Sequence, residues 1–248
     1  MSRVEGIYAL WLREFIVFKR ERSRIITSIF NPILWIFVYG GGLGSSVDIG
    51  GLNYQVFVYP GILAMTVLFT SVFYGVYIVW DRKIDILKEV LVAPLSRTTI
   101  FVGKVLGGCT DSMLQAFIVL LLSFALGVRL TPVTFLLALF LIFLLALSLV
   151  SAGLIIGSLM ESPEGFNMVV SFLVFPLFFF SGALFPLENL PIWISAITYV
   201  DPVTYGVDGL RTVILGISRF PFYANVVVLV AFAAAMFTIG TIAFERMK

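Results

Sequence analysis

VTFLLALFLIFLLALSLVSAGLIIG, at residues 133–157, contains no charged side chain, and it is longer than the roughly 20 apolar residues that a helix needs to cross a bilayer. Apolar stretches near that length recur along the chain and predict six membrane spans, at residues 25–44, 56–80, 105–127, 133–157, 167–185 and 222–243. The composition agrees, because 60% of the residues are apolar, 12% are charged and the mean hydropathy is +1.10, whereas soluble domains are about 25% charged. We therefore expect an all-α, polytopic membrane protein.

The distribution of basic residues predicts the orientation of this protein. An even number of spans places both termini on one side of the membrane, and Lys and Arg are retained preferentially in the cytoplasm. If the N-terminus is inside, all 16 Lys and Arg residues except Arg129, Arg211 and Arg219 fall on the inner side. The sequence thus predicts a multi-pass protein of the cell (inner or plasma) membrane with cytoplasmic N- and C-termini.

The segment before the first span forms a unit of its own, residues 1–24, ahead of a six-helix domain at 25–248. Residues 5–22 contain one apolar stripe at helical spacing, formed by Ile7, Trp11, Phe15 and Phe18. Most of the charged residues of this segment lie away from that stripe. An aromatic and aliphatic stripe opposite a basic face is typical of a helix that lies in the membrane interface. A charged anchor that only flanks the first span is the alternative.

The first inner connection, residues 81–104, predicts an amphipathic helix that Pro94 ends. Its apolar stripe consists of Ile84, Leu87 and Leu91, and its surrounding charges are Asp81, Asp85, Lys88 and Glu89. A charged helix held beside the membrane by two spans can act as a lever, because a soluble partner that grips it tilts both spans together. A solvated loop that merely returns the chain is the alternative.

The second inner connection, residues 158–166, contains Glu161 and Glu164 and no basic residue. Acidic residues influence orientation little, so the predicted topology stands. These carboxylates are suited to pair with basic residues of a partner or of the chain's own first connection, and solvated helix ends are the alternative.

The last outer connection, residues 186–221, is long and interrupted by four prolines: Pro186, Pro191, Pro202 and Pro221. Proline ends or kinks helices, and the apolar pieces between these prolines are too short to span a bilayer. We expect short re-entrant helices that cap the outer mouth of the bundle, since non-helical backbone at membrane depth requires protein or water to satisfy its polar groups.

Several classes of site are excluded by residue types. The chain has no histidine, which removes His-based zinc sites and Ser-His-Asp triads, and its single cysteine, Cys109, cannot form an internal disulfide. The only Gly-Lys pair, Gly103-Lys104, lacks the rest of a phosphate-binding loop. We therefore expect no catalytic site, no metal and no cofactor on this chain.

Two features inside the predicted spans have more than one interpretation. Asp111 is the only carboxylate in a predicted span, and a charge at the bilayer centre costs roughly 2.5–3.5 kcal/mol. Because it lies close to the predicted start of its span, we expect a role at the helix start, with a proton carrier as the alternative. The fifth span is rich in phenylalanine, and the candidates to line a substrate pathway are Phe172, Phe175 and Phe179; a subunit interface and lipid-facing packing are the alternatives.

Four stretches carry a resemblance to a known family: VYPGILAMTVLFTSVF (58–73), ILKEVLVAPLSRTTIFVGKVLG (86–107), FFSGALFPLENLP (179–191) and YVDPVTYGVDGLR (199–211). In this order and spacing the chain resembles the permease subunits of ABC-2 type transporters. It is most similar to the short prokaryotic branch that includes daunorubicin-resistance and nodulation-factor export permeases.

The resemblance implies a homodimer in the lipid bilayer bound to two copies of a separate ABC ATPase, which would carry ATP and Mg, and implies no nucleic-acid partner. It implies that residues 81–97 form the principal coupling helix, that residues 5–22 form a connecting helix, and that residues 186–215 form outer re-entrant helices. The residues expected to couple to the ATPase are Asp81, Arg82, Lys83, Asp85, Leu87, Lys88, Glu89, Glu161 and Glu164.

Two other functions remain as alternatives. An ion-coupled secondary transporter or a channel would act without an ATPase, but the predicted spans contain few ionisable residues, which such proteins use as ion or proton sites. A membrane-embedded enzyme would need a nucleophile with a base, or a metal cluster, and the residue types offer neither. The substrate, whether drug, lipid or glycan, is not encoded in any motif that we recognise.

Overall fold

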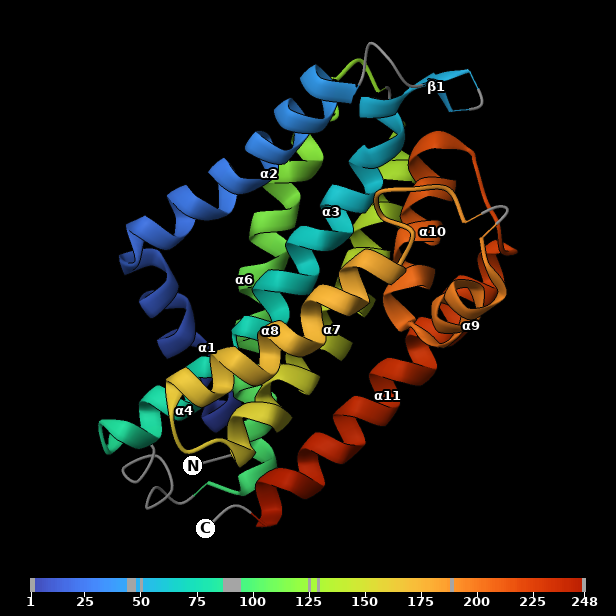
Figure 1. Cartoon of the computed structure of the whole chain (residues 1–248). Helices are drawn as coiled ribbons and strands as arrows, with labels where there is room; N and C mark the ends of the chain where they lie inside the picture. Colours follow the sequence, from blue (N-terminus) through green and yellow to red (C-terminus); the bar gives the residue numbers. More distant parts are fainter. Residues whose placement is uncertain are drawn as a thin grey trace.

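The computed structural model describes residues 3–43, 48–49, 51–86, 95–124, 126–128, 130–187 and 190–246, and within them the fold is a bundle of long helices (Figure 1). Both chain ends lie at the same end of the bundle. The helices are α1 (Arg3–Arg20), α2 (Arg22–Leu43), α3 (Tyr54–Phe73), α4 (Val76–Lys83), α6 (Arg97–Leu121), α7 (Pro132–Leu159), α8 (Pro163–Phe180), α9 (Ile192–Val200), α10 (Pro202–Leu215) and α11 (Phe222–Arg246). A two-residue hairpin, β1 (Asp48–Ile49) and β2 (Leu52–Asn53), precedes α3.

Five of the described helical stretches are long and apolar enough to cross a membrane: Tyr54–Lys83, which combines α3 and α4, Arg97–Leu121, Pro132–Leu159, Pro163–Phe180 and Phe222–Arg246. They coincide with the second to sixth predicted spans. The helix α2 occupies the place of the first predicted span, but it is not among the five. The α-helical fold with several membrane spans is therefore confirmed, and the first predicted span, residues 25–44, stays a prediction.

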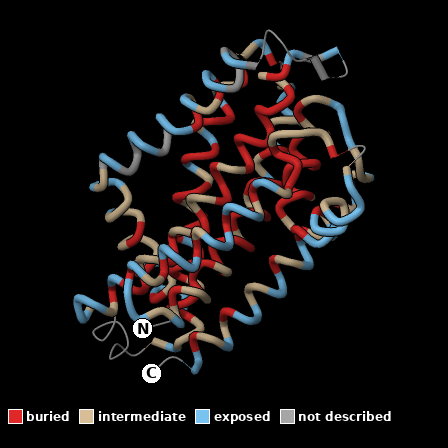
Figure 2. Tube along the Cα trace, in the orientation of Figure 1, coloured by how far each residue is buried: buried red, intermediate tan, exposed pale blue. Residues whose placement is uncertain are grey.

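The core of the bundle is formed by α3, α6 and α7, whose residues are largely buried (Figure 2). Glycines let α7 approach the junction between α3 and α4 until backbones touch. A Cβ atom on Gly75 would lie 2.0 Å from the carbonyl oxygen of Gly153, and one on Gly153 would lie 2.3 Å from that of Val72. Small residues at such crossings are common between membrane helices, because close packing replaces the hydrophobic effect as the driving force.

The helices α9 and α10 lie between α8 and α11, away from the two chain ends (Figure 1). Each begins at a proline that was expected to interrupt the segment, with α9 after Pro191 and α10 at Pro202. Asp201 caps α10 by accepting a hydrogen bond from the backbone N–H of Val203 at 2.9 Å. Asp208 accepts hydrogen bonds from the backbone N–H groups of Arg219 and Phe220 and from Asn225 Nδ2, so a buried carboxylate fixes the chain between α10 and α11.

The boundaries of the first inner connection differ from the prediction. Residues 81–83 are the last turn of α4 and continue the second span, and α6 begins at Arg97, where Ser96 accepts a hydrogen bond from the backbone N–H of Thr99. Between them, residues 87–94 lie outside the described part of the chain. Because α6 starts eight residues earlier than predicted, Asp111 lies in the middle of a helix; the expected role at a helix start is wrong.

Candidate functional site

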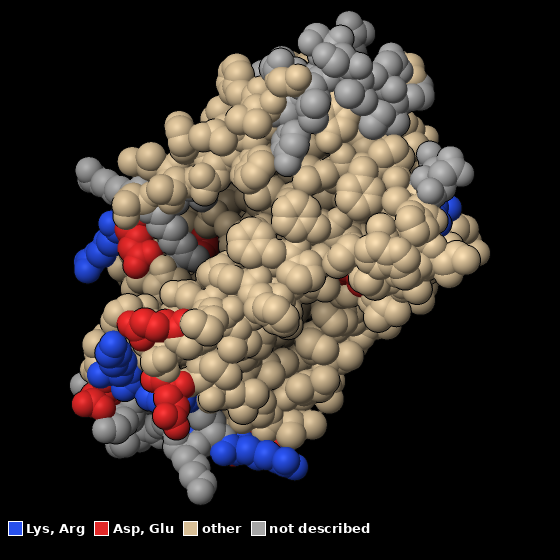
Figure 3. All heavy atoms as spheres, in the orientation of Figure 1, with Lys and Arg blue, Asp and Glu red and all other residues tan. Residues whose placement is uncertain are grey.

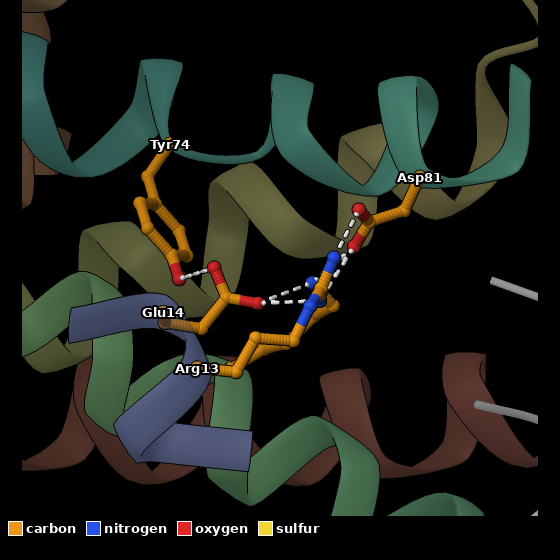
Figure 4. Close-up of polar contacts among 5 residues, drawn as sticks. Arg13, Glu14, Tyr74 and Asp81 are labelled. Carbon is orange, nitrogen blue, oxygen red and sulfur yellow. Dashed lines mark hydrogen bonds and ion pairs between the residues drawn. The ribbon is translucent and has the colours of Figure 1, made fainter. Parts of the chain in front are cut away.

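A cluster of charges, most of them buried, joins three helices (Figure 4). Arg13 and Glu14 come from α1, Asp81 from α4 and Lys104 from α6. Lys104 Nζ lies 2.9 Å from Glu14 Oε1 and 2.6 Å from Asp81 Oδ2. Arg13 lies 3.0 Å from Glu14 Oε1 and 2.8 Å from Asp81 Oδ1, and Tyr74 donates its hydroxyl hydrogen to Glu14 Oε2 at 2.9 Å.

The cluster contains two positive and two negative charges and is therefore balanced. The Lys104 side chain is 0% exposed, and those of Glu14 and Asp81 are 5% and 10% exposed. A buried charge is tolerated only where it is paired and hydrogen-bonded, and each of these groups has at least two partners. The hydrogen bond to Asp81 raises the pKa of the Arg13 guanidinium further above its ordinary value, so this group stays charged.

Glycines on α6 bring α1 close enough to complete the cluster. A Cβ atom on Gly107 would lie 2.6 Å from Glu14 Cβ, and one on Gly103 would lie 2.7 Å from Leu10 Cβ. The buried face of α1 consists of Gly6, Leu10 and Glu14. This face differs from the apolar stripe that the sequence indicated, because α1 packs on α6 through small and charged residues.

The sequence identified Asp81 as a residue for contact with a partner and missed Glu14 and Lys104 as partners of Asp81. In the structure Asp81 is buried and its carboxylate binds Arg13 and Lys104 of the same chain. Lys104 was counted with the inner connection, but it lies two turns inside α6. A basic residue inside an apolar helix, near Gly103 and Gly107, indicates that a buried partner exists, but it does not identify that partner.

The other expected coupling residues that the structure describes lie on the two inner connections. Lys83 and Asp85 are exposed, whereas Arg82 donates hydrogen bonds to the carbonyl oxygens of Ser158 and Met160, both at 2.9 Å. The two inner connections thus touch through a guanidinium and backbone carbonyls, while Glu161 and Glu164 are exposed. Leu87, Lys88 and Glu89 lie outside the described residues.

A cavity of about 590 Å³ opens between α2, α3, α6 and α8. Its walls are mainly aromatic and aliphatic, and the larger side chains are Trp35, Met65, Phe69, Phe73, Tyr77 and Phe175. A few polar side chains interrupt them: Thr27, Asn31, Thr66, Thr70 and Gln115. Mostly apolar concave sites with a few polar groups are typical of small-molecule binding sites.

Of the three phenylalanines expected to line a pathway, Phe175 borders this cavity. Its ring meets that of Phe69 edge to face, with centroids 5.5 Å apart. Phe172 is 84% exposed and Phe179 is 50% exposed on the outer face of α8, and neither lines the cavity. Phe69 of α3 lines the cavity beside Phe175.

Asp111 is not among the residues that line this cavity, but it contacts one of them. It is buried in α6 and accepts a hydrogen bond from Gln115, which in turn lines the cavity. Among the residues that the structure describes, no group of three or more Asp, Glu, Cys or His side chains is placed to hold a metal ion.

Comparison with known proteins finds one transporter family and relatives that include transport permeases. The profile of the ABC-2 type transporter family matches residues 5–215. The chain is 30% identical over 213 residues to the ycf38 transport permease of Cyanophora paradoxa, an alignment that covers 84% of this chain and 73% of that protein. It is 27% identical over 243 residues to the inner membrane transport permease YadH of Escherichia coli K12, which covers 94% and 92% of the two chains. It is 26% identical over 212 residues to nodulation protein J of Rhizobium leguminosarum bv. trifolii, with coverages of 84% and 80%.

Proposed function

The chain belongs to the ABC-2 type transporter family and is a membrane permease subunit of an ABC transporter; from this premise we propose that it is an exporter subunit that works as a homodimer with a separate ATPase. ATP binding by two ATPase subunits would draw the inner connections of the two permeases together. The path between the permeases would then open to the outside. The N- and C-termini would be cytoplasmic, at the end of the bundle where both lie.

The observation that carries this proposal is the buried charge cluster. It ties α1 and α6 to the last turn of α4, from which the first inner connection leaves. A force applied to that connection reaches two long helices and the N-terminal helix through charge-assisted hydrogen bonds, which are about twice as strong as neutral ones. On the face shown in Figure 3, charged side chains also gather at this end, where a soluble partner has access.

The homodimer is supported by two apolar faces on either side of α3. Along α2 the exposed side chains include Ile26, Phe30, Leu34 and Phe37, and along α8 they include Met168, Phe172, Phe175 and Phe179. Each set recurs at three or four residues and therefore lies on one helix face. Both helices also border the 590 Å³ cavity, so a second copy that covers these faces would enclose it.

The cavity supports an amphipathic substrate with an aromatic or aliphatic body and one or two hydrogen-bonding groups. Phe69, Phe73 and Phe175 offer ring faces and edges, and Asn31 and Gln115 offer amide groups. Among the lining residues that the structure describes, none carries a charge, which disfavours a highly charged solute, because burying an unpaired charge is costly.

The proposal is tested by purifying the full chain from the cells that produce it naturally and assaying substrate-stimulated ATP hydrolysis in vesicles. We expect a P-loop ATPase to co-purify, and we expect Asp85→Lys, Glu89→Lys and Leu87→Pro to lower the stimulation while membrane insertion stays intact. Arg3→Glu, a charge reversal at an exposed residue of α1, serves as the control. Unchanged stimulation in all three variants would refute the coupling role of residues 81–97.

An ion-coupled secondary transporter is the second candidate, and the buried Asp111 beside the cavity-lining Gln115 is the feature that favours it. The two candidates separate in vesicles that contain only this chain. Solute accumulation there under an ion gradient, lost in Asp111→Asn, would replace the ATP-driven proposal. Transport that requires the ATPase and ATP would exclude the ion-coupled candidate.

A further inference from the structure

A second hollow, a groove of about 940 Å³, lies where the ends of α4, α7 and α11 meet. This is the end of the molecule that carries both termini (Figure 1). One wall is apolar and consists of Ile155, Leu159, Ile239, Ile242 and Ala243. Among the described residues, the charged side chains that border it are Arg82, Glu161 and Arg246. The groove is separate from the cavity between α2, α3 and α8, with which it shares no lining residue.

The charged residues described at the groove carry a net charge of +1, since Arg82 and Arg246 together outnumber Glu161. Arg82 donates hydrogen bonds to the carbonyl oxygens of Ser158 and Met160 at the end of α7. Those carbonyls would otherwise repel an anion, because the C-terminal end of a helix carries partial negative charge. Within the described residues neither Arg82 nor Arg246 forms an ion pair with a carboxylate, so both charges are available to a ligand.

The apolar wall continues from these charges onto surface that a bilayer would cover. Leu159 is 69% exposed, and Ile239 and Ile242 are each 46% exposed. They lie on the last turns of α7 and α11, two helices that meet the length and hydropathy required of membrane spans. A ligand in this groove therefore meets guanidinium groups at one end and aliphatic side chains along its length.

We propose that this groove binds an anionic phospholipid, with the headgroup phosphate between Arg82 and Arg246 and an acyl chain along α7 and α11. One phosphodiester charge neutralises the net charge of the three ionisable groups. A zwitterionic phospholipid would leave that charge uncompensated, and a free phosphate ion would leave the apolar wall unused. Basic pockets between membrane helices at the interface are suited to anionic headgroups for the same electrostatic reason.

The test is native mass spectrometry of the delipidated full chain, titrated with dioleoyl phosphatidylglycerol or with dioleoyl phosphatidylcholine. We expect phosphatidylglycerol to bind more tightly, and we expect Arg246→Gln to weaken it roughly fivefold, which corresponds to about 1 kcal/mol for a basic residue near an anionic membrane surface. Arg246→Lys keeps the charge and should retain most of the affinity. Ile242→Trp, which fills the apolar wall but keeps both arginines, should also weaken phosphatidylglycerol binding.

Arg3→Gln is the matched control, because it removes one exposed positive charge of α1 and does not touch the groove. Equal binding of the two lipids by the unaltered chain would overturn the proposal, as would an equal loss of affinity in Arg3→Gln and Arg246→Gln. Crosslinks from Leu159→Cys and Ile242→Cys to a second copy or to the ATPase in the assembled transporter would overturn it too, since a protein would then occupy the groove. None of these outcomes depends on transport activity, so they leave the exporter proposal untouched.

Discussion

Lys104 and Asp81, which are 23 residues apart in the sequence, form an ion pair of 2.6 Å with the Lys104 side chain fully buried. The pair links α6 to the turn from which the first inner connection departs. The same ammonium group binds Glu14 of α1, so three helices share one charge centre. Packed elements that share such a centre move together, because interfaces have discrete arrangements and do not deform continuously. We infer that α1, α4 and α6 respond as one body when the inner connection is displaced.

Replacing Lys104 should therefore destabilise the whole bundle. Lys104→Met leaves Glu14 and Asp81 opposite Arg13 alone, and removing one partner from a buried ion pair typically costs about 3–5 kcal/mol. The double variant Lys104→Met/Glu14→Gln restores neutrality and should recover at least half of that loss. Denaturant unfolding in detergent micelles, followed by tryptophan fluorescence, measures both values. Equal stability of Lys104→Met and the wild type would show that the cluster contributes nothing to stability.

The crossing of α7 with the α3–α4 junction gives a second prediction. Gly153→Ala places a Cβ atom 2.3 Å from the carbonyl oxygen of Val72 and 3.0 Å from its Cα atom, a distance that only a backbone shift can relieve. We expect a loss of about 1–3 kcal/mol, as for other overpacked cores, seen as a lower unfolding temperature in detergent. Gly42→Ala is the control, since nothing lies within 4 Å of its Cβ position and alanine favours a helix. A loss in Gly42→Ala as large as that in Gly153→Ala would contradict this packing argument.

Much of the fold follows from local sequence patterns, and much of the site does not. The span at 133–157 was placed to within two residues of α7, because a long uncharged apolar stretch has one stable solution in a bilayer. Pro191 and Pro202 likewise marked the starts of α9 and α10. The charge cluster could not be predicted, because the partners of Lys104 come from helices 23 and 90 positions away. Hydropathy also misplaced the start of α6, since its first residues, 97–99, are polar and the serine cap at Ser96 defines the start of the helix.

The cavity gives a third prediction, which concerns transport. Phe175→Ala and Phe69→Ala each remove a ring from its wall. The substrate concentration that half-maximally stimulates ATP hydrolysis should therefore rise up to about tenfold, as expected when an aromatic contact of about 0.5–1.5 kcal/mol is lost. Phe140→Ala, which removes an exposed ring from α7 away from the cavity, should leave it unchanged. A similar shift in all three variants would indicate a general effect on folding and would remove the cavity as the substrate site.

The last prediction concerns the dependence of stability on pH. Burial raises the pKa of Asp201 from 3.8 to about 7, although the N–H of Val203 opposes this shift. Because the folded chain then holds this proton more tightly than the unfolded chain, its stability should fall as the pH rises from about 4 to about 7 and level off above that range. The chain has no histidine, so few other groups titrate there. Asp201→Asn keeps a capping oxygen for α10 and removes the titration.

We therefore expect the unfolding temperature of the wild type to decline between pH 5 and pH 8 and that of Asp201→Asn to change less, with the variant the more stable of the two at pH 8. Glu164→Gln, a matched neutralisation of an exposed carboxylate at the start of α8, should follow the wild-type curve. Parallel curves for the wild type and Asp201→Asn would mean that Asp201 does not exchange its proton on unfolding in this range. The decline would then have to come from other carboxylates of the chain.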